Sequence, residues 1–427
     1  MILKPEQHHT VLRYGMMLFC FFLPLAPRVA VYLSVAIFVS WLFTKQLGAR
    51  IRRMFRLLPL LFLSFFVLYL FGMVFTEDVA MGWSVVERKL SFLIFPLLFF
   101  TAERIHKEEC RRSLDLFLLG CTVASLYCLG RAGWDLANSG VNHFFYKDLG
   151  AYLKFHPTYF AMYIGFCLFL VLRRIFFEWY DIRPRLRWIY LGLVPYWAIF
   201  LVLLSARMQL LILALLLSIS LVFWMYQQRQ LLKGLMVAGA MAILGGIFFI
   251  AVPSTSYRFT ALVEKIRSGE TANIRIDIWR AAWPTVKENW ALGLGTGDVQ
   301  TGLDQAYSVV NLEAALSKHL NAHNQYLQTT LALGILGLSV WVFLLFQSFL
   351  AAYRTHFYLL QWFLWLFTLS CLTESMLETQ RGILFFGFIG TMLMAYHPPY
   401  EQPFSWPNRS KEQRQERRLA RKKRRHR

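Results

Sequence analysis

The chain has 427 residues, of which 57% are hydrophobic, 17% aromatic and 16% charged, and its mean hydropathy is +0.46. A single soluble core does not need so much apolar surface, so the composition excludes an ordinary soluble domain and indicates a polytopic membrane protein. The formal net charge of +21 does not indicate a nucleic-acid partner, because much of it lies in one basic tail from Arg409 to Arg427. We expect this tail to be disordered and to lie beside anionic lipid.

A membrane-spanning helix needs about 20 mainly apolar residues, and by this measure the sequence predicts about twelve such helices. The expected fold class is therefore all-α, with the lipid bilayer as the main partner of the chain. The predicted spans are residues 11–26, 29–46, 57–76, 84–101, 114–132, 156–176, 186–204, 208–226, 232–252, 325–350, 356–372 and 382–397.

Basic residues in the short loops predict the orientation, because Lys and Arg accumulate on the cytoplasmic side of a membrane. They follow the second, fourth, sixth and eighth predicted spans. Examples are Arg50, Arg52, Arg53, Arg111, Arg112, Arg173, Arg174, Arg183, Arg185 and Arg229. These loops are expected in the cytoplasm, and an even number of spans puts both termini there as well.

The longest connection, residues 253–322, is too long for a simple turn and is expected to form a small outward-facing domain. It separates spans one to nine in residues 1–252 from spans ten to twelve in residues 323–398, and residues 399–427 form the tail. Ile274 to Trp290 has helical spacing, with Pro284 expected to bend or interrupt the helix. The tryptophans Trp279, Trp283 and Trp290 suit a helix at headgroup depth.

Two motifs in the same loop resemble ligand sites but are better explained otherwise. Gly293-Leu-Gly295-Thr-Gly297 has neither the strand before it nor the helix after it that a dinucleotide site needs, so we expect a chain reversal. His319 and His323 are four apart, as on a metal-binding helix. However, Leu320 stands where a metalloprotease helix carries its glutamate, and no third ligand follows. We therefore expect no bound metal.

Three arginines and one histidine remain as candidates for chemistry: Arg207 between two spans, Arg275 and Arg280 in the long loop, and His323 at the start of another span. If they lie on one side of the membrane, they form a site that binds an anion and moves a proton. Arginine stays protonated and grips two oxygens of a phosphate at once. Imidazole is a usable proton acceptor near neutral pH. The alternatives are arginines that extend to lipid headgroups and a histidine that caps a helix.

The stretch His323-Asn324, followed by Gly334-Ile-Leu-Gly337, resembles the signature of the O-antigen ligase and polymerase superfamily. Ser205-Ala206-Arg207 resembles the short serine-arginine turn of that family, although Ala206 separates two residues that are often adjacent. Arg275 with Trp279 resembles the arginine-tryptophan pattern of its large periplasmic loop. The similarity covers roughly residues 150–395. It implies a C-type glycosyltransferase fold in the bacterial inner membrane, with residues 253–322 as a periplasmic loop domain.

The resemblance implies transfer of an O-antigen or related glycan from undecaprenyl diphosphate to a sugar hydroxyl of lipid A-core. His323 would accept the proton of that hydroxyl, and Arg207 and Arg275 would stabilise the departing diphosphate. Arg280 and Arg381 are weaker candidates for substrate binding. Asn324 and Gln325 either bind sugar or phosphate oxygens, or satisfy the first turn of a helix. No carboxylate pair stands out, so we expect one inverting displacement.

Further polar residues are expected on the same side. His156, at the start of a span, is a candidate for acceptor or diphosphate binding, or a structural helix start. Glu374 and Glu378 are candidates to orient His323 or Arg381. We expect no cofactor, because arginines replace the divalent ion that many lipid-sugar transferases hold. The alternatives are a polysaccharide polymerase that uses the same donor and, in a different class, a flippase or transporter of lipid-linked sugars.

Overall fold

The computed structural model describes residues 5–44, 47–102, 105–180, 182–227 and 274–396, with a few single residues between 230 and 239. All regular elements in these ranges are helices, which confirms the all-α fold class. The first part of the chain forms α1 (Pro5–Leu25), α2 (Pro27–Leu42), α3 (Leu47–Arg52), η1 (Arg53–Phe55), α4 (Leu57–Gly72), η2 (Met73–Phe75), α5 (Val79–Lys89), α6 (Ser91–Phe100), α7 (Lys107–Ser139), α8 (Tyr146–Ala151), α9 (Pro157–Phe177), α10 (Pro184–Leu203) and α11 (Arg207–Gln227). The C-terminal part forms α14 (Ile274–Glu288), α15 (Val299–Val309), α16 (Glu313–Leu316), α17 (Gln325–Arg354), α18 (Tyr358–Ser370), η3 (Met376–Glu378), α19 (Gln380–Leu384), η4 (Phe385–Gly390) and α20 (Thr391–Ala395).

Within the described residues, six helices are long and apolar enough to cross a membrane. They are Leu57–Phe75, Lys107–Ser139, Pro157–Phe177, Pro184–Leu203, Arg207–Tyr226 and Gln325–Arg354. Three shorter apolar helices, Pro27–Leu42, Tyr358–Ser370 and Gln380–Ala395, fall below the length needed to span the hydrocarbon layer alone. The structure thus confirms six candidate spans, and the expected span 232–252 lies outside the described residues apart from three single positions.

The expected span 84–101 is not one helix. The chain forms α5 up to Lys89 and α6 from Ser91, with a break at Leu90. Lys89 is fully buried, and its ammonium group donates to the carbonyl of Leu377 at 2.7 Å and to the carboxylate of Glu378 at 2.8 Å. A buried cation needs such partners, so the polar contacts hold the end of α5 against η3, and only α6 continues as an apolar helix.

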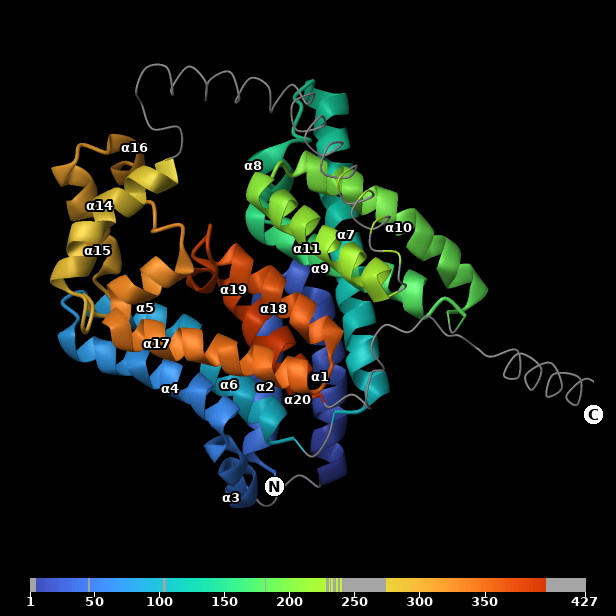
Figure 1. Ribbon diagram of the computed structural model, residues 1–427, viewed down its shortest axis with the longest axis horizontal. Helices are drawn as coiled ribbons and strands as arrows, with labels where there is room; N and C mark the ends of the chain where they lie inside the picture. Colours follow the sequence, from blue (N-terminus) through green and yellow to red (C-terminus); the bar gives the residue numbers. More distant parts are fainter. Residues whose placement is uncertain are drawn as a thin grey trace, which may run out of the picture.

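The core of the bundle is aromatic. α4 and α17 lie side by side, with α6 and the C-terminal helices next to them (Figure 1). Trp341 of α17 packs against Phe92 of α6 and Phe386 of η4, with ring centroids 6.2 and 5.3 Å apart. Lipid tails are as apolar as these side chains, so association of helices in a membrane depends on close packing of this kind.

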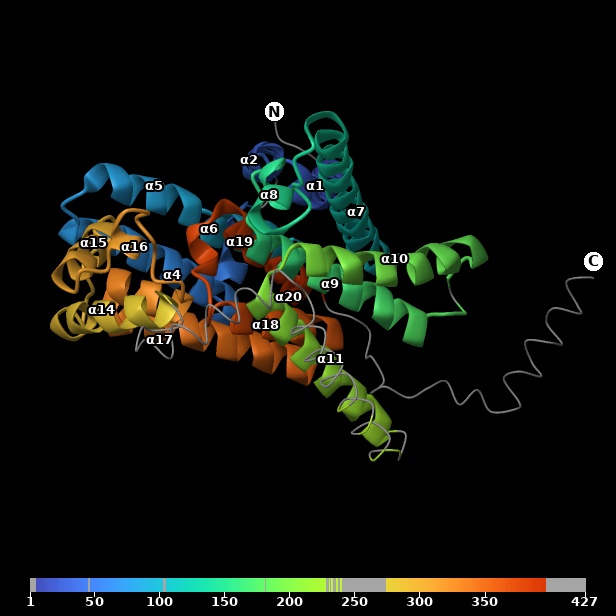
Figure 2. The same cartoon turned by 90° about the horizontal axis from the view of Figure 1, so that it is seen from above.

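The helices of the long loop form a cap at one end of the bundle. In both views, α14, α15 and α16 gather beside the same ends of α4, α5 and α17 (Figures 1 and 2). The carboxylate of Asp298 accepts from the backbone N–H groups of Glu77 and Asp78, at 2.9 and 2.8 Å. This contact ties the start of α15 to the start of α5.

The helix α17 is broken at Gly334, where φ is +61° and ψ is −157°. The break opens a place for the glycine loop after α14. The N–H groups of Leu294 and Gly295 donate to the carbonyls of Leu331 and Ala332, at 2.8 and 3.2 Å, and Ile335 N–H donates to the carbonyl of Trp290 at 2.8 Å. The glycine loop therefore holds the cap against α17.

We expect Gly334→Ala to destabilise the protein and to abolish its activity. A Cβ at this position would lie 2.3 Å from the carbonyl of Ala291, and the backbone conformation is essentially restricted to glycine. Such strain costs about 1–3 kcal/mol before any clash is counted. The check is thermal unfolding in detergent, with Gly130→Ala in α7 as the control, because a Cβ at Gly130 meets nothing within 4 Å. Equal stability of the two variants would contradict the prediction.

Candidate functional site

His323 lies in the turn between α16 and α17. Both His319 and His323 have positive φ, of 44° and 46°, so the two residues do not lie on one helix. Each has a partner of its own: the Nδ1 atom of His319 lies 2.7 Å from a carboxylate oxygen of Asp304. The backbone N–H of His323 donates to the side chain of Asn321 at 2.9 Å, which fixes the turn.

Glu374 is the partner of His323. Nδ1 of the imidazole lies 3.0 Å from Oε1 of Glu374, whose side chain is only 4% exposed, while that of His323 is 20% exposed. Glu374 lies in the turn between α18 and η3, and the hydroxyl of Tyr159 in α9 donates to the carbonyl of the adjacent Ser375 at 3.2 Å. The pair thus joins the start of α17 to the end of α18, and the imidazole stays accessible.

The electrostatics of the pair favour an ionised carboxylate on Glu374. Burial raises the pKa of Glu374, but the hydrogen bond and charge of His323 and the charges of His156 and Arg275 outweigh burial, so this pKa lies below its ordinary value. Because a carboxylate only accepts hydrogen bonds, the proton of a neutral imidazole must be on Nδ1. Nε2 is then left as the proton acceptor.

Arg275 lies on the other side of the same carboxylate. Its Nη2 atom is 3.9 Å from Oε2 of Glu374, and its side chain is partly exposed. One turn further along α14, the indole N–H of Trp279 donates to the carbonyl of Ala322, at 2.8 Å, directly before His323. The predicted arginine-tryptophan spacing therefore has a structural reason, because Trp279 fastens α14 to the His323 turn and so places Arg275 beside Glu374.

Arg207 begins α11, after a turn in which Ser205 has a φ of 49°. Gln209, two residues after Arg207, is bonded to the hydroxyl of Ser370 at the end of α18. Its Nε2 donates to that hydroxyl at 2.9 Å, and the hydroxyl donates to its Oε1 at 3.1 Å. Glu374 follows Ser370 by one helical turn. These bonds hold the start of α11, and with it Arg207, at the same end of the bundle as Glu374.

His156 precedes α9 and belongs to the same neighbourhood. Desolvation by the surrounding protein lowers the pKa of His156; Glu374 opposes this shift, while the positive charges of Lys147, His323 and Arg275 add to it. The imidazole is therefore neutral near neutral pH. The structure thus brings together Arg275, His323, Glu374 and His156, with Arg207 at the same end.

Asn324 and Gln325 have structural contacts instead. The side chain of Asn324 accepts from the N–H groups of Tyr326 and Leu327, at 2.9 and 3.1 Å, and so caps α17. Gln325 is fully buried; its Oε1 accepts from the N–H of Leu377 at 2.7 Å, and its Nε2 donates to Thr329 at 3.0 Å. The alternative reading of the sequence, in which these residues satisfy the first turn of a helix, fits the contacts of Asn324.

Arg381 and Glu378 are also occupied by protein contacts. The guanidinium of Arg381 is buried; it donates to the carbonyls of Pro24 and Leu153, at 2.9 and 2.6 Å, and stacks on Phe155 with 3.7 Å to the ring centroid. Glu378 pairs with Lys89, not with His323 or Arg381. Arg381 thus ties α19 to the ends of α1 and α8, and of the two glutamates only Glu374 contacts His323.

The remaining expectations concern α14. Arg280 is exposed on this helix, away from the contacts that Arg275 makes. The helix runs through Pro284 without interruption. Trp283 and Trp290 are 54% and 62% exposed, as expected of side chains at a lipid border, whereas Trp279 is engaged by Ala322.

Sequence reasoning did not select two residues that position the site, Gln209 and Lys89. Gln209 is 2% exposed and Lys89 fully buried. Each is a polar residue inside or next to an apolar run, and such residues have a partner or a function when they are buried in a membrane protein. A polar residue in or beside an apolar run is therefore the sequence signal that could have identified both residues.

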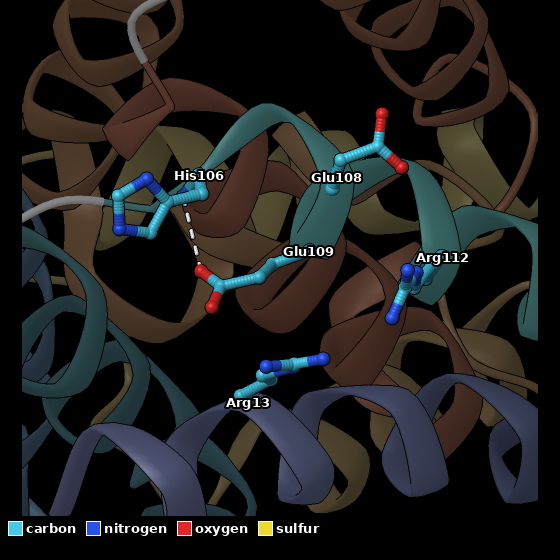
Figure 3. Close-up of a pocket in the computed structure, with 5 residues that line it drawn as sticks. All are labelled: Arg13, His106, Glu108, Glu109 and Arg112. Carbon is cyan, nitrogen blue, oxygen red and sulfur yellow. Dashed lines mark hydrogen bonds between the residues drawn. The ribbon is translucent and has the colours of Figure 1, made fainter. Parts of the chain in front are cut away.

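A second cluster lies at the other end of the bundle, where α1 meets the start of α7. Figure 3 shows its pocket, which is lined by Arg13, His106, Glu108, Glu109 and Arg112. Ligand atoms of His9, His106 and Glu109 lie within 4.8 Å of one another, as a metal site requires. However, Oε2 of Glu109 already accepts from the N–H of His106, and Arg13 and Arg112 add positive charge. This cluster is explained as an ion-pair contact between two helices.

The lowered pKa of Glu374 predicts how stability depends on pH. The carboxylate contributes stability above the unfolded pKa of about 4.3, and this contribution is lost as the pH falls through the lower folded pKa. We expect wild type to unfold at a higher temperature than Glu374→Gln at pH 7, and the difference to close below about pH 4. Thermal unfolding of both proteins across this range is the check. A difference that persists at the acid end would mean that charge is not its cause.

In a comparison with known protein families, residues 192–342 match the family model that is described as O-antigen ligase. The matched segment is narrower than the resemblance over residues 150–395. It contains Arg207, Arg275 and His323, and it ends before Glu374. No curated protein is similar enough to the chain to count as a match. Residues 192–342 are thus similar to the O-antigen ligase family, which confirms the resemblance of this part of the chain to the O-antigen ligase superfamily.

Proposed function

We propose that the protein transfers an O-antigen or related glycan from undecaprenyl diphosphate to a sugar hydroxyl of lipid A-core, at the periplasmic face of the bacterial inner membrane. The observation that carries this proposal is the contact of one buried carboxylate, Glu374, with both His323 and Arg275. A proton acceptor and a phosphate-binding cation are thereby held side by side. Glycan transfer from a diphosphate donor needs both.

In the proposed reaction, Nε2 of His323 accepts the proton of the acceptor hydroxyl while the oxygen of that hydroxyl bonds to the anomeric carbon of the donor sugar. The bond from that carbon to the diphosphate oxygen breaks, and undecaprenyl diphosphate leaves with the electron pair. Arg275 and Arg207 stabilise the charge that gathers on the leaving diphosphate. Glu374 keeps the imidazole oriented and its Nδ1 protonated, as a carboxylate does for a catalytic histidine in hydrolases.

Inversion at the anomeric carbon follows from a single displacement. Retention would need a carboxylate nucleophile. Glu374 is engaged by His323 and Arg275, and Glu378 by Lys89. Both glutamates therefore already have cationic or imidazole partners. The arginines supply positive charge, so the proposed reaction needs no metal.

The arrangement of charge supports the periplasmic side for the site. In Figure 1 the basic segment of α3 lies at the bottom and the start of α7 lies in the lower half, while α14 and α16 lie at the upper left. By the preference of Lys and Arg for the cytoplasm, the bottom faces inward. We therefore propose that residues 253–322 form a periplasmic domain, and that both termini and the tail of residues 399–427 are cytoplasmic.

The test is a reaction of the purified protein with one polyprenyl-linked glycan donor and two acceptors, lipid A-core and a second lipid-linked repeat. Products are resolved by mass, with and without a metal chelator. Glycan on lipid A-core in both conditions supports the proposal. Product on the lipid-linked repeat alone would identify a polymerase, and donor movement across vesicles without product would identify a flippase.

A further inference from the structure

A pocket of about 230 Å³ lies next to the His323 turn, between α5, α15, α17 and η3. Its polar wall includes Arg88, Gln300, Asn321, Gln328 and Glu378. Its remaining wall includes apolar groups of Tyr69, Val85 and Ala332. The reaction proposed above uses none of these side chains.

Several polar atoms of this wall have no protein partner within the described ranges. Asn321 and Gln328 each accept one hydrogen bond through their oxygen, from His323 N–H and Ala322 N–H, and neither amide nitrogen donates to any residue that the structure describes. The amide of Gln300 donates to Asp304 and Leu320, while its oxygen accepts nothing from the described chain. The pocket therefore presents both donors and acceptors in one small space.

The charge of the wall distinguishes between ligands. Arg88 contributes a cation, but its Nη1 donates to the carbonyl of Glu378 at 2.7 Å, and the Glu378 carboxylate lies in the same wall. Burial raises the pKa of Glu378, yet Lys89, Arg88 and a hydrogen bond from Gln325 outweigh it, so this pKa lies below its ordinary value. A carboxylate repels a phosphate, whereas it accepts a hydrogen bond from a hydroxyl.

The size and position also indicate the ligand class. The volume is below the about 300–1,000 Å³ usual for pockets that hold drug-sized ligands, so it suits one ring and not a stretch of glycan. Asn321 and Gln328 line the pocket. The side chain of Gln328 also accepts from the backbone N–H of Ala322, and that of Asn321 accepts from the backbone N–H of His323. A ring bound here is directly connected to the turn that carries the proton acceptor.

We propose that this pocket is a saccharide subsite that binds one neutral sugar ring of a glycan substrate. The inference rests on the proposed glycan transfer. The ring is held by the amides of Asn321 and Gln328 as donors and by Gln300 and Glu378 as acceptors, with Tyr69 and Val85 as apolar wall. The sugar belongs either to the donor glycan or to the acceptor, and the experiment distinguishes these sources.

The pocket can be probed without turnover. All six cysteines of the chain are buried, so a thiol introduced at Met81, which lines the pocket and is 42% exposed, becomes the accessible one. We expect a maleimide to label Met81→Cys about tenfold more slowly when a glycan ligand occupies about nine-tenths of the sites. Val79→Cys on the same helix, exposed and outside the pocket wall, is the matched control.

The ligands compared are delipidated core oligosaccharide, the undecaprenyl-linked donor and inorganic pyrophosphate. Protection of Met81→Cys by the core oligosaccharide assigns the ring to the acceptor, and protection by the donor alone assigns it to the donor. Labelling that no glycan slows, equal protection of Val79→Cys, or protection by pyrophosphate alone would overturn the proposal.

Kinetics give an independent measurement. Gln300→Leu removes the free amide oxygen, and with it the bonds that the amide donates to Asp304 and Leu320, at nearly constant size. We expect KM for one glycan substrate to rise about 2- to 10-fold with kcat unchanged. Gln305→Leu, exposed on the same helix, should leave both constants as in wild type. Unchanged constants in Gln300→Leu would contradict the proposal. Labelling does not depend on turnover, so the subsite and the proposed function fail separately.

Discussion

His323→Ala is expected to lower kcat by about 10²–10⁴-fold, the usual contribution of a positioned general base. The imidazole is partly exposed and hydrogen-bonded to Glu374 through Nδ1, so Nε2 is the atom that accepts the proton in the proposed reaction. Alanine removes that acceptor but leaves the cap of α17, which Asn324 supplies. The loss should therefore appear in kcat, together with a lower unfolding temperature, because the buried carboxylate of Glu374 loses its hydrogen-bond partner.

The control for this variant is His143→Ala, which changes a histidine whose ring neighbour is Tyr152 and which makes no contact with the site. Glu374→Gln provides a graded companion, since an amide can hold the imidazole in the wrong tautomer and lower kcat without removing the ring. Product formation from the purified donor and acceptor measures all three. If His323→Ala turned over at the wild-type rate, His323 would not be the proton acceptor.

The sequence could predict the features that depend on local pattern. Apolar runs predicted α4, α9, α10, α11 and α17, because a helix that spans a membrane needs about 20 consecutive apolar residues. The turn before Arg207 and the helix that carries Arg275 and Trp279 also follow from short spacing. The resemblance selected His323, and the site indeed gathers His323, Arg275 and His156 around Glu374.

The sequence could not predict which distant residues become partners. Glu374 and Glu378 look equivalent at a spacing of four, yet Glu374 contacts His323 while Glu378 pairs with Lys89, at the end of α5. Arg381 is likewise a candidate for phosphate binding, because it is an arginine. However, its guanidinium donates to two backbone carbonyls and stacks on a phenyl ring. Such choices depend on how helices pack, which a single sequence does not encode in any local spacing.

The break of α17 at Gly334 is another feature beyond local pattern. The apolar run is continuous across this position, so periodicity predicts one straight helix. What breaks it is the approach of Ala291 and the glycine loop, whose backbone groups bond to carbonyls of α17. Gly334, the first glycine of the motif that resembles the family signature, thus has a structural role in docking the cap.

Arg275→Ala is expected to lower kcat/KM by about 10²–10³-fold, as the loss of one preorganised donor to a developing anion does. Arg275→Lys keeps the charge but loses the planar two-point grip on phosphate oxygens, so it should recover only part of this loss. The loss should also weaken inhibition by pyrophosphate, which stands in for the leaving group. Lys287→Ala, an exposed cation near the end of the same helix, is the control.

Because Arg275 also contacts Glu374, its loss can act through His323 as well as through the diphosphate. The double variant Arg275→Ala with Glu374→Gln separates the two routes. If Arg275 binds the leaving group, its effect on pyrophosphate inhibition persists in the Glu374→Gln background, since that contact does not pass through the imidazole. An effect of Arg275→Ala that vanished in this background would make Arg275 a positioning residue for the Glu374–His323 pair, and Arg207 would then remain as the arginine that meets the diphosphate.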